Sequence, residues 1–146
     1  MIRRDYLLRM VEQCVQALAR SLGLVQRGQF DQARAEVNQA MQDLAGLDLS
    51  GIQGLSESEL LAALLRGEPT QILRQKCLLV VALLRQAGEV YAAEGRPEES
   101  RQCYLKALNL QLEILLRQTD EVLAAGDLPR PEVESGLAEL RAQRPH

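Results

Sequence analysis

Apolar residues recur every three or four positions along most of the chain, and this spacing predicts helices. The first helix is expected from residue 2 to about 27. At 100° per residue its apolar positions cover roughly 200° of the circumference, whereas one packing contact needs only about 100°. This helix is therefore expected to contact neighbours on two sides. Its apolar positions are Leu7, Leu8, Met10, Val11, Cys14, Val15, Ala17, Leu18, Leu22, Leu24 and Val25.

The same spacing predicts five further helices, at residues 30–45, about 57–66, about 71–94, 97 to about 117, and 131 to about 142. Gly28 and Gly95 stand where a C′ glycine ends a helix. Ser56 and Glu59 form the S-x-x-E pattern of a capping box, and the glycine- and serine-rich stretch before them is expected to be a connector. The last helix has a narrow apolar stripe, which is typical of a helix that caps the end of a stack.

Two segments of the chain align with each other as an internal repeat. They are a first helical hairpin at about 2–45 and a second at about 70–118. Small residues, Ala40 and Ala107, are expected where the helices cross closely, and Val37 and Tyr104 are expected to fill the space between them. The expected organisation is one domain over residues 1–146, with a connector and short helix at 46–69 and a C-terminal cap at about 131–143.

The second hairpin, LLRQAGEVYAAEGRPEESRQCYLKAL, resembles a tetratricopeptide repeat. The positions that carry the resemblance are Gly88, Tyr91, Gly95, Tyr104 and Ala107. Three positions depart from the motif: Ala87 replaces Leu, Ser100 replaces Ala, and Leu112 stands where Pro commonly ends the second helix. The second helix is therefore expected to continue by about one more turn.

The first hairpin is similar to a degenerate copy of the same repeat. It keeps Gly28, Ala33 and Ala40, but Ser21 and Leu24 stand where Gly and Tyr are expected. From IRRDYLLRMVEQ through GLSESELLAALL to the second hairpin, the chain also resembles a bacterial family of tetratricopeptide-like proteins of unknown function. That resemblance implies an all-α fold of antiparallel helix pairs and a bacterial cytoplasmic location, and it implies no activity.

Tetratricopeptide proteins bind peptides or partner proteins on the concave face formed by the first helix of each pair, and this analogy implies a groove here. Its residues would be Val15, Leu18, Leu22 and Val25 of the first helix, with Ala82, Arg85, Glu89 and Ala92 of the fourth. A clamp for a C-terminal carboxylate is not expected, because Glu89 opposes the single cation Arg85. The groove could bind a helix or peptide of another protein, or it could be filled by the third helix or by a second copy.

Composition narrows the class of protein. Aromatic residues make up 3% of the chain, and Leu, Ala and Val dominate the apolar positions, which favours packed helices over a sheet. The formal net charge of -3 argues against a nucleic-acid partner. The longest apolar run is too short to span a bilayer, so no membrane partner is expected. The N-terminus lacks the pattern of a signal peptide, and a cytoplasmic location is expected.

Residues that carry catalytic or metal chemistry are scarce. The single histidine is His146, and no cysteine pair at metal-ligand spacing, phosphate-binding glycine loop or G-x-S-x-G motif occurs. The three cysteines, Cys14, Cys77 and Cys103, lie within apolar helical patterns and are expected to be core residues. Acidic pairs such as Glu98 and Glu99 suit the first turn of a helix. The sequence therefore predicts a non-enzymatic protein with no cofactor and no metal.

Overall fold

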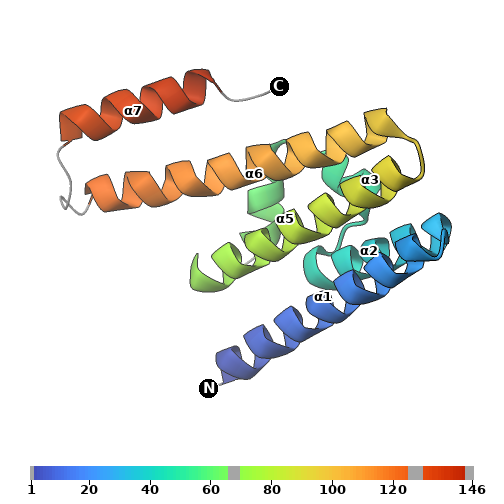
Figure 1. Ribbon diagram of the computed structural model, residues 1–146. Coiled ribbons are helices and arrows are strands. Elements are labelled where there is room, and N and C mark those ends of the chain that lie inside the picture. Colours follow the sequence, from blue (N-terminus) through green and yellow to red (C-terminus); the bar gives the residue numbers. More distant parts are fainter. Residues whose placement is uncertain (1, 66–69, 125–129, 144–146) are drawn as a thin grey trace.

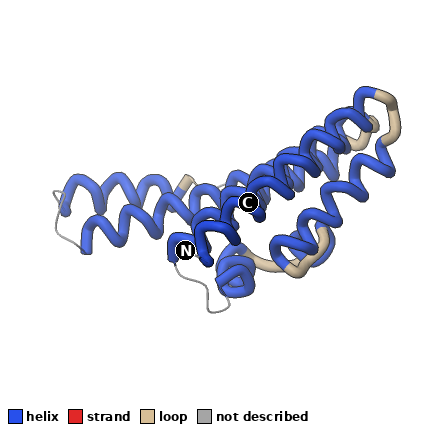
Figure 2. The backbone as a smooth tube through the Cα atoms, turned by 90° about the horizontal axis from the view of Figure 1, so that it is seen from below, coloured by secondary structure: helices blue, strands red, loops and turns tan. Residues whose placement is uncertain are grey.

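The computed structural model describes residues 2–65, 70–124 and 130–143. Within these ranges the chain forms helices and no strand (Figure 1 and Figure 2). The helices are α1 (Ile2–Gln26), α2 (Phe30–Ala45), α3 (Leu49–Gln53), α4 (Glu57–Leu65), α5 (Thr70–Ala93), α6 (Pro97–Ala124) and α7 (Arg130–Ala142). The expectation of an all-helical fold is confirmed for this part of the chain.

The helices pair as two antiparallel hairpins, and α5 joins the pairs (Figure 1). Hairpin 1 is α1 with α2, and hairpin 2 is α5 with α6. Because α5 packs against both helices of hairpin 1 as well as against α6, a single core connects the two pairs. Its fully buried members include Val37 and Met41 of α2 and Val80, Leu83 and Leu84 of α5.

The two hairpin turns have the same geometry, 67 residues apart. Gly28 N donates to Val25 O at 3.0 Å, and Gly95 N donates to Ala92 O at 3.1 Å. A second bond follows one residue later in each turn, from Gln29 N to Leu24 O at 2.9 Å and from Arg96 N to Tyr91 O at 2.8 Å. Both glycines have positive φ, 74° and 82°, which other residues rarely adopt. An offset of 67 residues therefore relates equivalent positions in the two hairpins.

The helix crossing inside each hairpin uses a matched pair of small and large residues. In hairpin 2, a Cβ added to Gly88 would lie 2.9 Å from Cε2 of Tyr104, so the tyrosine ring needs a glycine opposite it. The equivalent residues of hairpin 1 are Ser21 and Val37, both fully buried. Ser21 is larger than Gly88, and its partner Val37 is smaller than Tyr104. The two residues at each crossing thus compensate in size, as close packing requires.

Each crossing is bridged by a serine hydroxyl. In hairpin 1 the serine lies on the first helix of the pair, and in hairpin 2 it lies on the second. Ser21 Oγ on α1 donates to Ala33 O at 3.1 Å, whereas Ser100 Oγ on α6 donates to Gly88 O at 2.8 Å. Ala33 and Ser100 are equivalent positions, as are Ser21 and Gly88. One buried hydroxyl per crossing is thus satisfied by one carbonyl, as buried polar groups require.

The connector between the hairpins contains a helix that the apolar spacing did not predict. Instead of six helices the described residues contain seven, because α3 forms within the expected connector. Asp48 caps this helix by accepting a hydrogen bond from Gly51 N at 2.8 Å, and Ile52 is fully buried. The expected capping box of α4 is confirmed, since Ser56 N donates to Glu59 and Glu59 N donates to Ser56 Oγ.

The end of hairpin 2 also differs from the expectation. Helix α6 continues to Ala124 and does not end near 117, because no glycine or proline interrupts it and its last turns bury Leu116 and Leu123 against Leu137 of α7. Helix α7 therefore lies along the C-terminal half of α6 (Figure 1), and Arg141 pairs there with Asp120 at 3.1 Å. It does not cover the end of the stack as a cap.

Candidate functional site

Four groove positions expected on the first helix lie together on one side of α1. Val15 and Leu22 leave 55% and 52% of their surface exposed, and Leu18 and Val25 are half-buried. Leu8, which is 54% exposed, extends the row toward the N-terminus. We call this row the α1 stripe, and its members are Leu8, Val11, Val15, Leu18, Leu22 and Val25.

Most of the α1 stripe lies outside the inner core, although Leu18 packs against it. The buried residues of α1 stand one position earlier at each step: Met10, Cys14, Ala17 and Ser21. A shift of one residue turns a helix face by about 100°, so α1 has one apolar face packed inside and a second directed outward. Helix α1 was expected to contact neighbours on two sides, and it contacts both α2 and α5. Among the described residues, however, nothing buries Val15 or Leu22.

The α5 residues expected beside this stripe are more polar. Arg85 and Glu89 are exposed, Ala82 is half-buried and Ala92 is exposed. Burial and a hydrogen bond to the Glu89 carboxylate raise the pKa of Tyr104 to about 12, so its hydroxyl stays protonated at neutral pH. The third expected helix, α4, packs on α5 and α6 and leaves Val15 and Leu22 exposed.

A second apolar surface, which the sequence did not predict, lies at the outer side of hairpin 2. A hollow of about 740 Å³ lies there between the end of α5 and the first half of α6. Leu108 is 44% exposed in it. We call this surface the end face, and its main residues are Ala92, Pro97, Arg101, Tyr104, Leu105 and Leu108.

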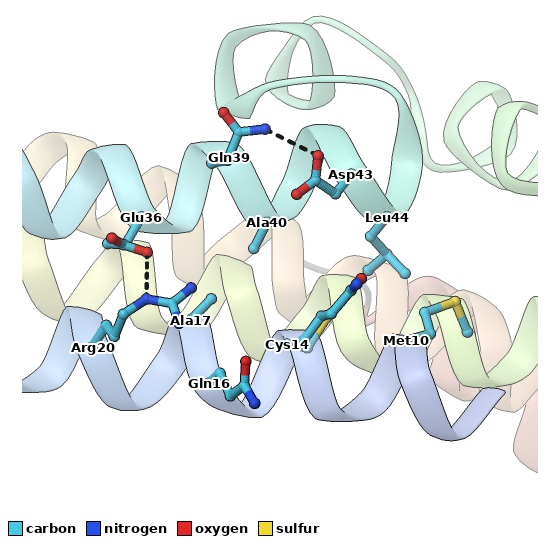
Figure 3. Close-up of a pocket in the computed structure, with 11 residues that line it drawn as sticks. Met10, Cys14, Gln16, Ala17, Arg20, Glu36, Gln39, Ala40, Asp43 and Leu44 are labelled. Atoms are coloured by element: carbon cyan, nitrogen blue, oxygen red, sulfur yellow. Dashed lines mark hydrogen bonds and ion pairs between the residues drawn. The ribbon is translucent and has the colours of Figure 1, made fainter. Parts of the chain in front are cut away.

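A smaller, polar hollow of about 180 Å³ lies along the outer seam of hairpin 1 (Figure 3). Arg20 Nε pairs with Glu36 Oε2 at 2.9 Å, and Gln39 Nε2 donates to Asp43 Oδ1 at 2.9 Å. The polar side chains of this hollow thus pair with each other across and along the two helices. Cys14 borders this hollow, but burial raises the pKa of its thiol.

The cysteines confirm their expected place in the core, since all three are buried. Burial raises the pKa of Cys77 and that of Cys103 to about 11. At neutral pH these thiols are protonated, and a protonated thiol is a poor nucleophile and metal ligand. No group of three histidine, cysteine or acidic residues that could hold a metal occurs within the described ranges, and His146 lies outside them.

A charged cluster joins the two hairpins next to the turns. Arg34 of α2 donates to both carboxylate oxygens of Glu94, just after α5, and also to Asp31 of its own helix. Its guanidinium lies 5.4 Å from the centre of the Tyr91 ring. The hydrogen bond from Arg34, aided by Arg96, holds the pKa of Glu94 below its usual range.

The lowered pKa of Glu94 predicts a pH-dependent stability. A carboxylate with a lower pKa in the folded state stabilises the fold at pH values above its unfolded pKa, and this contribution is lost as the pH falls through the folded pKa. Glu94→Gln is therefore expected to be less stable than the wild type at pH 7, with the difference shrinking as the pH falls below about 4.3. Urea unfolding between pH 7 and pH 3 measures both.

The control is Glu98→Gln, which breaks an exposed pair within α6, Arg101 to Glu98 at 2.9 Å. It is expected to cost less at pH 7, because both side chains of that pair are solvated. Equal losses for the two variants at pH 7, or a constant difference between Glu94→Gln and the wild type at all pH values, would contradict the role assigned to the Arg34 pair.

The chain matches no protein-family model, and no characterised protein and no solved structure is significantly similar to it. Among the described helices none is long and apolar enough to cross a membrane.

Proposed function

We propose that this chain is a non-catalytic protein-interaction module built from tetratricopeptide-like helix pairs, which binds an amphipathic helix or peptide of a partner protein along the α1 stripe. The observation that carries the proposal is the exposure of Leu8, Val15 and Leu22, each about half accessible and seven residues apart on one helix face. Contiguous apolar surface of this kind commonly marks an interaction site.

The spacing of the α1 stripe suits a helical partner. Its six positions follow one another in steps of three and four residues, the spacing at which one helix inserts its side chains between those of another. The exposed charges of Arg85 and Glu89 lie on the neighbouring helix and would orient the bound segment. A partner with apolar residues at matching steps and opposite charges at one edge would be complementary to both.

The tetratricopeptide-like part of the proposal is supported by the shared turn geometry, the 67-residue offset and the matched pairs at the two crossings. The non-catalytic part is supported by the protonated, buried thiols and by the mutual pairing of the polar groups in Figure 3. We also propose a bacterial origin and a cytoplasmic location for this protein.

Self-association is the second candidate function, and the α1 stripe is also the observation that favours it. Steps of three and four residues are the spacing of a two-helix seam between identical chains. In an antiparallel pair of α1 helices, Val15 would face Leu18 of the other copy, and Leu8 would face Val25. The protein would then be a homo-oligomeric scaffold whose groove is filled by itself.

The double substitution Val15→Glu/Leu22→Glu is expected to abolish partner binding and leave the fold intact, because both side chains are already about half in water. A partner captured from host cells would be purified and titrated against the wild type and the variant, and hydrogen exchange would locate its contact. The matched control is Gln13→Glu/Gln16→Glu on another face of α1, which should bind like the wild type.

Light scattering separates the two candidates. A monomeric wild type that binds its partner through α1 supports the interaction module. A dimer that becomes monomeric in Val15→Glu/Leu22→Glu supports self-association instead. Partner binding that survives the double substitution, with protection on another helix, would refute the assignment of the α1 stripe.

A further inference from the structure

The end face of hairpin 2 is equivalent to the surface of hairpin 1 that α5 covers. Subtracting 67 converts Tyr104 to Val37 and Leu108 to Met41. Val37 and Met41 are fully buried in the core that hairpin 1 shares with α5. Leu108, in contrast, is 44% exposed. The same helix-receiving surface thus occurs twice, and within the described part of the chain a helix covers only the copy on hairpin 1.

The opposite end of the stack has a different chemistry. Val80, Leu83 and Ala87 of α5 are fully buried, and they lie on the same helical row as Glu94, which pairs with Arg34 of hairpin 1. Subtracting 67 from these positions gives Gln13, Gln16 and Arg20 on α1, all exposed. Figure 3 shows Gln16 and Arg20 on this side, where Arg20 pairs with Glu36 of α2. The first hairpin therefore ends the stack with a polar surface, as a terminal repeat does.

A second copy stacked head to tail is a poor occupant of the end face. It would place Gln13, Gln16 and Arg20 of one chain on the apolar residues of the other, leaving their polar groups without water. It would also bring Arg27, the equivalent of Glu94, close to Arg101, the equivalent of Arg34. Two like charges would then meet where the hairpins of this chain place an arginine and a carboxylate.

Helix α7 leaves the end face open. Its Leu137 packs on Leu116 and Leu123, and its last turn reaches Asp120 through Arg141. These contacts lie on the C-terminal half of α6, whereas the part of the end face that α6 contributes runs from Pro97 to Leu108. Figure 1 shows the first half of α6 extending beyond the end of α7.

The charge pattern around Arg101 indicates what an occupant would carry. In hairpin 1, Arg34 pairs with Asp31 of its own helix and with Glu94 at the end of the helix seated on it. Arg101 reproduces the first of these pairs with Glu98 at 2.9 Å. A carboxylate equivalent to Glu94 would therefore belong to the helix that binds the end face.

We propose that the end face binds an amphipathic helix of a partner protein, seated as α5 is seated on hairpin 1, with a carboxylate near its C-terminal end that pairs with Arg101. Its buried row would resemble Val80, Leu83 and Ala87, which are apolar and of small to medium size. This surface is distinct from the α1 stripe, so the inference does not depend on the proposed function.

The test uses two synthetic helical peptides that copy residues 76–94 of this chain with Cys77→Ser, one with the native Glu94 and one with Glu94→Lys. Binding of each labelled peptide to the full-length protein is followed by fluorescence anisotropy. The Glu94 peptide is expected to bind more tightly than the Lys peptide. Leu108→Glu in the protein is expected to weaken binding at least about tenfold, and Arg101→Glu is expected to reverse the preference between the peptides.

Val15→Glu is the matched protein control, and it should bind the Glu94 peptide like the wild type, because it alters only the α1 stripe. Urea unfolding confirms that each protein variant is folded. Failure of the peptide to bind, equal binding by Leu108→Glu, or loss of binding only in Val15→Glu would overturn the inference. A wild-type dimer that Leu108→Glu converts to monomer would also overturn it, because a second copy would then be the occupant.

Discussion

Leu83→Ala is expected to lower the free energy of unfolding by about 3 kcal/mol, within the range that buried leucines show when truncated to alanine. Leu83 is fully buried on the row of α5 that carries Glu94, the partner of Arg34 in hairpin 1. Removing its isobutyl group leaves a cavity between helices that both hairpins hold in place, so the space cannot close by a shift of one loop. Urea unfolding monitored by circular dichroism at 222 nm measures the loss.

The control is Leu78→Ala on the same helix. Leu78 is 45% exposed, so its truncation removes little buried area and should cost less than about 1 kcal/mol. Similar losses for the two variants would mean that α5 is not packed between hairpin 1 and α6, and the packing described above would be wrong.

The second large effect concerns the crossing inside hairpin 2. Gly88→Ser should destabilise the protein by about 2 kcal/mol, because the new Cβ would lie 2.9 Å from the Tyr104 ring. The better helix propensity of serine recovers only about 0.5 kcal/mol of that loss. Tyr104→Val should also destabilise the fold by about 2 kcal/mol, because it removes the ring that fills the crossing.

The double variant Gly88→Ser/Tyr104→Val copies the pair found in hairpin 1, Ser21 with Val37. It is expected to be more stable than the sum of the two single losses predicts, with a favourable coupling of about 1 to 2 kcal/mol. A double-mutant cycle by urea unfolding gives this coupling directly. Additive losses would mean that the two hairpins do not share one packing rule.

The local patterns of the sequence were sufficient to locate the main helices. Apolar spacing and the glycines at 28 and 95 depend only on nearby residues, so the hairpin turns could be predicted before their hydrogen bonds were known. Helix α3 could not, because it depends on burial of Ile52 and on the cap from Asp48, in a stretch rich in glycine and serine. The end of α6 depends likewise on Leu137 of α7, a contact distant in sequence.

The two candidate sites also differ in how far the sequence alone could predict them. Four residues of the α1 stripe, Val15, Leu18, Leu22 and Val25, could be placed on one face of the first helix from apolar spacing and repeat position, whereas Leu8 and Val11 were not assigned to it. The end face was missed because Tyr104 and Leu108 have the same pattern as buried residues of hairpin 1. Their exposure depends on which helix follows in space, and the position of α7 on the later part of α6 is set by tertiary packing.

The most direct test of the stacked-hairpin arrangement is a set of methyl NOEs measured on the full-length protein. This arrangement predicts NOEs between the methyl groups of Val37 or Met41 on α2 and those of Val80 or Leu83 on α5, together with none between Leu108 and α7. Hairpins that show no NOEs to each other, or a Leu108 methyl group in contact with α7, would contradict it.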